Sequence, residues 1–136
     1  MFLLNKAKKT DAAALVTPTT TKQIGDSAED LALGHLQSQG LRLVTRNYRT
    51  PWRGGGEIDL ILQESDGTLV FVEVRRRASG QFGGAAASVT AAKQRRIIFA
   101  ARHYLMRLPT WPPCRFDVVL LEGGLVQWLK AAFDAS

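Results

Sequence analysis

Two stretches of the chain place apolar residues at the spacing of an amphipathic helix. The first covers about residues 26–39, and its apolar face is formed by Ala28, Leu31, Ala32 and Leu36. Asp26 and Ser27 are candidate capping residues, each with an acid three positions later, and Gly40 follows the last apolar position. The second stretch covers about residues 90–108, and its apolar positions are Ile97, Ala101, Tyr104, Leu105 and Leu108. We therefore predict two helices.

Five shorter stretches are rich in β-branched and aromatic residues, as strands are. They cover about residues 41–48, 57–62, 68–75, 115–121 and 126–129. The resulting order is α-β-β-β-α-β-β, with no internal repeat. This order predicts an α+β fold in which helices flank a small mixed sheet.

The first part of the chain differs in composition from the rest. Residues 1–23 are rich in Ala, Thr and Lys, include Pro18, and show no sustained hydrophobic period. We expect this segment to be a disordered tail. Residues 24–136 are expected to form a single domain, because domains cluster at roughly 100 to 150 residues.

Charge and composition narrow the classes of function. The formal net charge is +6, and residues 42–115 hold 13 basic against 5 acidic side chains, which favours a polyanionic partner. No run approaches the roughly 20 apolar residues of a membrane span, so no membrane association is expected. The single cysteine, Cys114, excludes an internal disulfide and a cysteine-based zinc site. A cytoplasmic location is the expectation.

The second and third predicted strands should form a hairpin that brings acidic residues together. With a three-residue loop, Ser65-Asp66-Gly67, Ile61 faces Phe71 and Asp59 faces Glu73. The same register places Glu57 opposite Arg75. A register shifted by one residue would move the two acids to opposite faces.

Two facing carboxylates within apolar strands repel each other, so their charge must be neutralised. A shared proton would do this, and so would Arg75 or Arg77. Two carboxylates are also oxygen ligands that Mg²⁺ or Mn²⁺ prefers. The simpler alternative is a surface ion pair between Glu57 and Arg75, with Asp59 and Glu73 as solvated strand edges.

The motifs resemble a known group of proteins. Asp59 followed by Glu73-Val74-Arg75 is similar to the Asp, then (Asp/Glu)-x-Lys pattern of restriction-endonuclease-like nucleases, whose core runs α-β-β-β-α-β. More closely, five motifs in order resemble the YraN-like family of small bacterial proteins: Gly25-x-x-Ala28-Glu29-x-x-Ala32, Gly56-Glu57-Ile58-Asp59-Leu60-Ile61, Phe71-Val72-Glu73-Val74-Arg75, Ser88-Val89-Thr90-x-x-Lys93-Gln94 and Arg115-Phe116-Asp117-Val118-Val119. The family's nuclease label comes from likeness to archaeal Holliday-junction resolvases.

The resemblance implies roles for individual residues. It makes Asp59, Glu73 and Glu29 ligands of Mg²⁺ or Mn²⁺, together with the carbonyl of Val74, and it makes Asp59, Glu73, Glu29 and Arg75 the catalytic set. Glu57 would be an accessory acid. Arg75 replaces the signature lysine, and arginine cannot act as a general base near neutral pH. It can still position water or stabilise charge on a phosphate.

Basic residues provide candidate contacts to nucleic acid, since arginine suits bidentate phosphate binding. The predicted contacts are Arg53, Arg77, Lys93, Gln94 and Arg96, of which the last three open the second helix. A polar helix start is an equal alternative for those three. Of the three tryptophans, Trp52 is the best candidate for stacking on a base.

Together these observations predict a metal-dependent endonuclease that hydrolyses phosphodiester bonds in DNA, with branched or structured DNA implied by the resolvase likeness. The first alternative is a catalytically silent module that binds nucleic acid or a protein partner on the same fold. The second is a structural protein whose acids form a buried ion-pair network with Arg75 and Arg77. The sequence leaves the oligomeric state open, including a homodimer.

Overall fold

The computed structural model describes residues 21–77 and 89–135. Most of the predicted tail therefore lies outside the described residues, although residues 21–23 belong to the first described helix. Neither helix in the described part of the chain is long and apolar enough to cross a membrane.

The observed elements follow the predicted order, α-β-β-β-α-β-β, which is confirmed. They are α2 (Thr21–Ser38), β1 (Arg42–Arg49), β2 (Glu57–Gln63), β3 (Leu69–Arg76), α3 (Ala91–Leu105), β4 (Cys114–Glu122) and β5 (Leu125–Phe133). The five strands form one sheet in the order β1-β2-β3-β4-β5. Only β3 and β4 are parallel, with α3 in the connection between them, and the other pairs are antiparallel. The predicted mixed α+β fold is confirmed.

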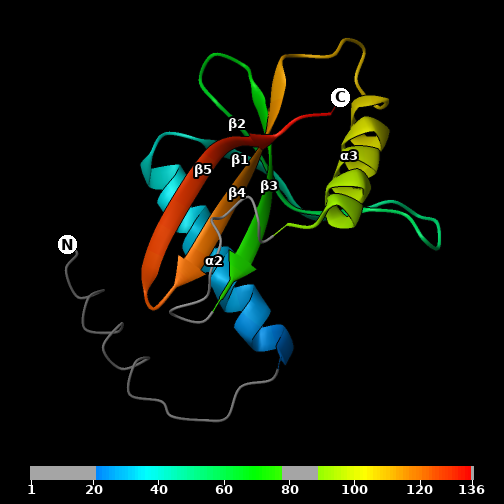
Figure 1. Cartoon of the computed structure of the whole chain (residues 1–136). Coiled ribbons are helices and arrows are strands. Elements are labelled where there is room, and N and C mark those ends of the chain that lie inside the picture. Colours follow the sequence, from blue (N-terminus) through cyan, green and yellow to red (C-terminus); the bar gives the residue numbers. More distant parts are fainter. Residues whose placement is uncertain (1–20, 78–88, 136) are drawn as a thin grey trace.

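The helices cover opposite faces of the sheet (Figure 1). One apolar cluster joins α3 to one face, and its buried residues include Ile58, Ile61, Phe71, Ile97, Ala101, Leu105, Phe116 and Val118. The other joins α2 to the opposite face through Ala28, Ala32, Leu36, Leu60, Leu62, Val70, Val72 and Val119. Because both faces are covered, the central strands are buried along most of their length.

Both helices differ from the predicted bounds. The caps predicted at Asp26 and Ser27 are wrong, because α2 already begins at Thr21. No proline lies between Thr21 and Ser27, so the helix can extend past these weaker start signals. The start of α3 was predicted well, since the Thr90 side chain caps it by accepting a hydrogen bond from the backbone N–H of Lys93 at 3.1 Å.

The β2–β3 hairpin has the predicted register. Ile61 pairs with Phe71, and Gly67 adopts the left-handed conformation (φ 95°) that the three-residue loop requires. The hairpin closes where the backbone N–H of Glu64 donates to the carbonyl of Thr68 at 2.9 Å. This register fixes which residues meet at the far ends of the two strands.

Candidate active site

Strands β2 and β3 part at the end of the hairpin, opposite its turn. The last ladder pair is Leu60 with Val72, although both strands continue beyond it. Beyond that point the carboxylate of Asp59 replaces a backbone partner, because its Oδ2 accepts a hydrogen bond from the N–H of Val74 at 2.8 Å. Asp59 is therefore held in place by the backbone of the neighbouring strand.

The side-chain alternation of β2 breaks at Asp59. Ile58 packs on the α3 face and Leu60 on the α2 face, although residues two apart in a regular strand share one face. Asn47, which the β1–β2 register places across from Asp59, has a positive φ of 50°. Both strands are thus irregular at this position, which separates Asp59 from the regular pattern of the sheet.

Glu73 lies beside Asp59 and is buried. Its side chain is 4% exposed and within hydrogen-bonding reach of the Asp59 carboxyl group. The nearest cations are Arg75, whose Nη1 lies 3.6 Å from Glu73 Oε2, and Lys93, whose Nζ lies 3.9 Å from the same oxygen. Both distances exceed those of a strong charge-assisted hydrogen bond. Glu73 is therefore buried beside the half-buried Asp59, and its two cationic partners lie near the outer limit of ion-pair distance.

This arrangement favours a proton on Glu73. Burial, and then repulsion from Asp59, raises the pKa of Glu73 to about 8. Burial also raises the pKa of Asp59, against the lowering effect of the Val74 N–H. The alternative in which these two acids are solvated strand edges is excluded for Glu73 by its burial.

Glu29 approaches the pair from α2. Its side chain is 14% exposed and lies 3.6 Å from the guanidinium of Arg46, which also binds Asp30 at 2.8 Å. Burial, and then the charge of Asp59, raises the pKa of Glu29. Within residues 21–77 and 89–135, no three His, Cys, Asp or Glu side chains are gathered closely enough to hold a metal ion as they stand. Glu29 is thus near Asp59 but engaged with Arg46.

The predicted placement of Glu57 opposite Arg75 is wrong, and the alternative of an ion pair between them is not observed. Glu57 lies 3.5 Å from the Nε of Arg49, its ladder partner on β1, while Arg75 approaches Glu73. The cause is the parting of β2 and β3, which ends their pairing before Glu57 while β1 and β2 stay paired.

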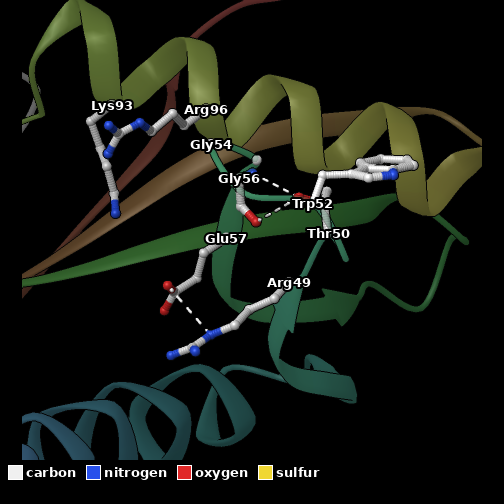
Figure 2. A pocket seen from close by; sticks show the side chains of 9 residues that line it. Arg49, Thr50, Trp52, Gly54, Gly56, Glu57, Lys93 and Arg96 are labelled. Atoms are coloured by element: carbon white, nitrogen blue, oxygen red, sulfur yellow. Dashed lines mark hydrogen bonds and ion pairs between the residues drawn. The ribbon is translucent and has the colours of Figure 1, made fainter.

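A hollow of about 220 Å³ lies beside the acid pair, between the β1–β2 loop and α3. Figure 2 shows Lys93 and Arg96 projecting from α3 on one side and the Arg49–Glu57 ion pair on the other. Its remaining lining residues are Thr50, Trp52, Gly54, Gly55 and Gly56. With three cations against one acid in its lining, the hollow suits an anion such as a phosphate.

The loop that forms one wall of the hollow is fixed at both ends. The side chain of Thr50 accepts a hydrogen bond from the N–H of Gly56 at 3.0 Å, and the N–H of Thr50 donates to the Gly56 carbonyl at 3.1 Å. A Cβ at Gly56 would lie 1.9 Å from the carbonyl oxygen of Arg96. Only glycine therefore permits this loop to pack against α3.

The structure separates the predicted contacts to nucleic acid into two groups. Lys93 and Arg96 line the hollow, and Arg53 is exposed in the adjacent loop. Gln94 instead donates to the carbonyl of Val89 at 3.0 Å, and Arg77 lies 3.3 Å from Glu122. The last two side chains are engaged within the domain and do not line the hollow.

Sequence reasoning missed two residues of this region. Arg49 was not assigned to the site, although it lines the hollow and pairs with Glu57. Thr50 was not singled out, although its side chain closes the loop by accepting a hydrogen bond from the N–H of Gly56. Pairing the first two strands across the loop would have revealed both, but the long connection between Arg49 and Glu57 does not fix the register of a hairpin as a tight turn does.

Comparison with known proteins finds similarity to one family throughout. The model of a family described as Uncharacterised protein family UPF0102 matches residues 28–121. A UPF0102 protein of Paracidovorax citrulli is 71% identical over 117 residues, which is 86% of this chain and 87% of the relative. One from Albidiferax ferrireducens is 71% identical over 116 residues, covering 85% and 91%. One from Methylibium petroleiphilum is 62% identical over 120 residues, covering 86% and 98%.

Proposed function

The chain belongs to the UPF0102 family, which is the YraN-like family that its motifs resemble, and from this premise we propose that it is a metal-dependent endonuclease that hydrolyses phosphodiester bonds in DNA. The observation that carries the proposal is the buried Glu73 beside the half-buried Asp59 where β2 and β3 part. A buried acid beside a second acid, with cations no nearer than 3.6 Å, is costly to a fold, so a functional reason for keeping it is favoured.

The residues at this position fit a hard divalent cation. Asp59, Glu73 and the carbonyl of Val74 supply oxygen ligands, which Mg²⁺ and Mn²⁺ prefer. Glu29 is close enough to Asp59 for their charges to interact, and it would become a metal ligand once its ion pair with Arg46 is broken. When bound, the ion would polarise the scissile phosphate and lower the pKa of the attacking water.

The other side chains bind and orient the phosphate. Arg75 remains charged near neutral pH, so it stabilises negative charge on the phosphate and does not take a proton. Lys93 approaches the carboxylate of Glu73 from α3 and supplies a second cation beside Arg75. Arg49 and Arg96 contact the DNA backbone from the hollow.

The preference for branched or structured DNA belongs to the proposal by likeness to Holliday-junction resolvases. One observation favours a second candidate function, a silent module that binds nucleic acid. Arg75 stands where the related nucleases carry lysine, and arginine offers no proton-accepting atom. Both functions require binding to phosphates, so a binding assay does not separate them.

Cleavage does separate them. The purified chain is incubated with flap, junction, duplex and single-stranded DNA, with Mg²⁺ or Mn²⁺, beside Asp59→Ala and a reaction with EDTA. The endonuclease cuts at least one substrate only when metal is present, and Asp59→Ala does not cut although its thermal melt shows a folded domain. Absence of cutting with either metal overturns the endonuclease, and binding of the same DNAs without cutting supports the silent module.

A further inference from the structure

A second surface lies next to the hollow and combines exposed aromatic and basic side chains. Trp52 is 56% exposed and Phe99 48% exposed, and their ring centroids are 6.1 Å apart. Arg95 and Arg96 are exposed on the same helix as Phe99. We call Trp52, Phe99, Arg95 and Arg96 the aromatic-basic surface. Large aromatic side chains left in solvent beside cations commonly mark a binding surface.

The aromatic side chains are held in position before any partner binds. Trp52 packs edge-on against His103 with ring centroids 4.9 Å apart, and its carbonyl accepts a hydrogen bond from the N–H of Gly55 at 3.1 Å. The close packing of Gly56 against Arg96 fixes the same loop on α3. Figure 2 shows the Trp52 ring lying along α3. Little conformational entropy would therefore be lost when a flat ligand stacks here.

The aromatic-basic surface is continuous with the candidate active site. A second hollow, of about 280 Å³, is lined by Ala92, Arg95, Phe99, Gly54, Gly55 and Arg96. The last three also line the hollow that contains Lys93. Lys93 in turn lies 3.9 Å from Glu73. A bound polymer that lies along the two hollows would pass from Phe99 across Arg96 toward Glu73.

We propose that the aromatic-basic surface binds an unpaired nucleotide next to the phosphodiester bond that is cut, with the base packed against the rings of both Phe99 and Trp52 and its phosphate bound by Arg95 and Arg96. This inference rests on the proposed nuclease function and adds its substrate class. A base inside a duplex is stacked on both faces by its neighbours, whereas an unpaired base can stack on a protein ring. The substrate is therefore DNA with a single-stranded segment at the cleavage position.

Binding without metal tests this inference separately from catalysis. In EDTA, fluorescence anisotropy measures the affinity of the full chain for a labelled single strand and for a blunt duplex of the same length. Phe99→Ala and Trp52→Ala weaken single-strand binding by at least about fivefold each, because stacking contributes at least ~1 kcal/mol per base, and change duplex binding by less than about twofold. Trp111→Ala is the matched control, since Trp111 is 59% exposed but lines neither hollow.

A second pair of variants distinguishes stacking from general apolar contact. Phe99→Tyr keeps a ring face and retains wild-type affinity, whereas Phe99→Leu keeps apolar volume and loses affinity as Phe99→Ala does. Equal affinity of the wild type for single strand and duplex, or full single-strand affinity in Phe99→Leu, overturns the inference. Metal-dependent cutting of blunt duplex alone would overturn it while supporting the nuclease. A preference for single strands without any cutting would support binding of an unpaired nucleotide by the aromatic-basic surface while overturning the nuclease.

Discussion

Replacing Glu73 with glutamine should stabilise the metal-free protein at high pH. The amide that Glu73→Gln introduces can donate a hydrogen bond to Asp59, as a protonated Glu73 does, but it cannot acquire a negative charge. In the wild type, the proton that Glu73 holds is lost as the pH rises through its raised pKa of about 8. Above that pH, the buried carboxylate of Glu73 and the half-buried carboxylate of Asp59 repel each other.

The expected size of the effect follows from the two pKa values. The folded-state pKa of about 8 lies above the ordinary value of 4.5, so the folded state binds a proton that the unfolded chain has released. The stability that this proton contributes is fully present below pH 4.5 and is lost as the pH rises through 8. At about 1.4 kcal/mol per pH unit, the loss reaches up to about 5 kcal/mol. That is a large share of a typical folding free energy.

Urea unfolding in EDTA at pH 5, 7 and 9 measures this effect. We expect Glu73→Gln to match the wild type near pH 5 and to exceed it increasingly at pH 7 and 9. Asp134→Asn is the control for removing one negative charge, because Asp134 is exposed near the end of the chain and outside the site. A Glu73→Gln protein that is less stable than the wild type at pH 9 would refute this reasoning and support a stabilising ion pair with Arg75 or Lys93.

Two further predictions concern the loop and the cations. Gly56→Ala should destabilise the fold by about 3 kcal/mol or more in urea unfolding, because the added Cβ would overlap the Arg96 carbonyl. Gly34→Ala is the control in α2, where the added Cβ meets open space, and it should stabilise the fold by roughly 0.5–1 kcal/mol. Equal effects of the two substitutions would contradict the close packing of Gly56 against α3. Arg75→Lys should keep or raise metal-dependent cleavage, whereas Lys93→Ala should lower it by on the order of 10² and should also weaken DNA binding in EDTA, because Lys93 lines the hollow. Full activity in Lys93→Ala would remove Lys93 from the site.

The sequence predicted most of the fold because its signals were local. The β2–β3 register follows from a short turn with a left-handed Gly67, and the confirmed pairing of Ile61 with Phe71 brought Asp59 and Glu73 to the same end of the hairpin. The start of α3 was predicted at about residue 90 from the apolar spacing, and the structure shows that Thr90 caps the helix there. In each case neighbouring residues determine the conformation, so the sequence alone is informative.

The errors arose where tertiary contacts decide. The pairing of Glu57 with Arg49 depends on the parting of β2 and β3, which a regular ladder does not predict. The approach of Lys93 to Glu73 depends on how α3 packs over the sheet, and helix periodicity does not contain that information. The engagement of Arg77 with Glu122 likewise joins distant segments of the chain.

Single-turnover cleavage measures whether Asp59 and Glu73 act in the hydrolysis of DNA. The wild type, Asp59→Asn and Glu73→Gln are compared on the best substrate of the DNA panel at saturating Mg²⁺, after thermal melts confirm that all three are folded. We predict metal-dependent cutting by the wild type and loss of cutting in both variants, with DNA binding equal or tighter because negative charge near the phosphate is removed. Cutting by both folded variants at the wild-type rate would contradict this prediction.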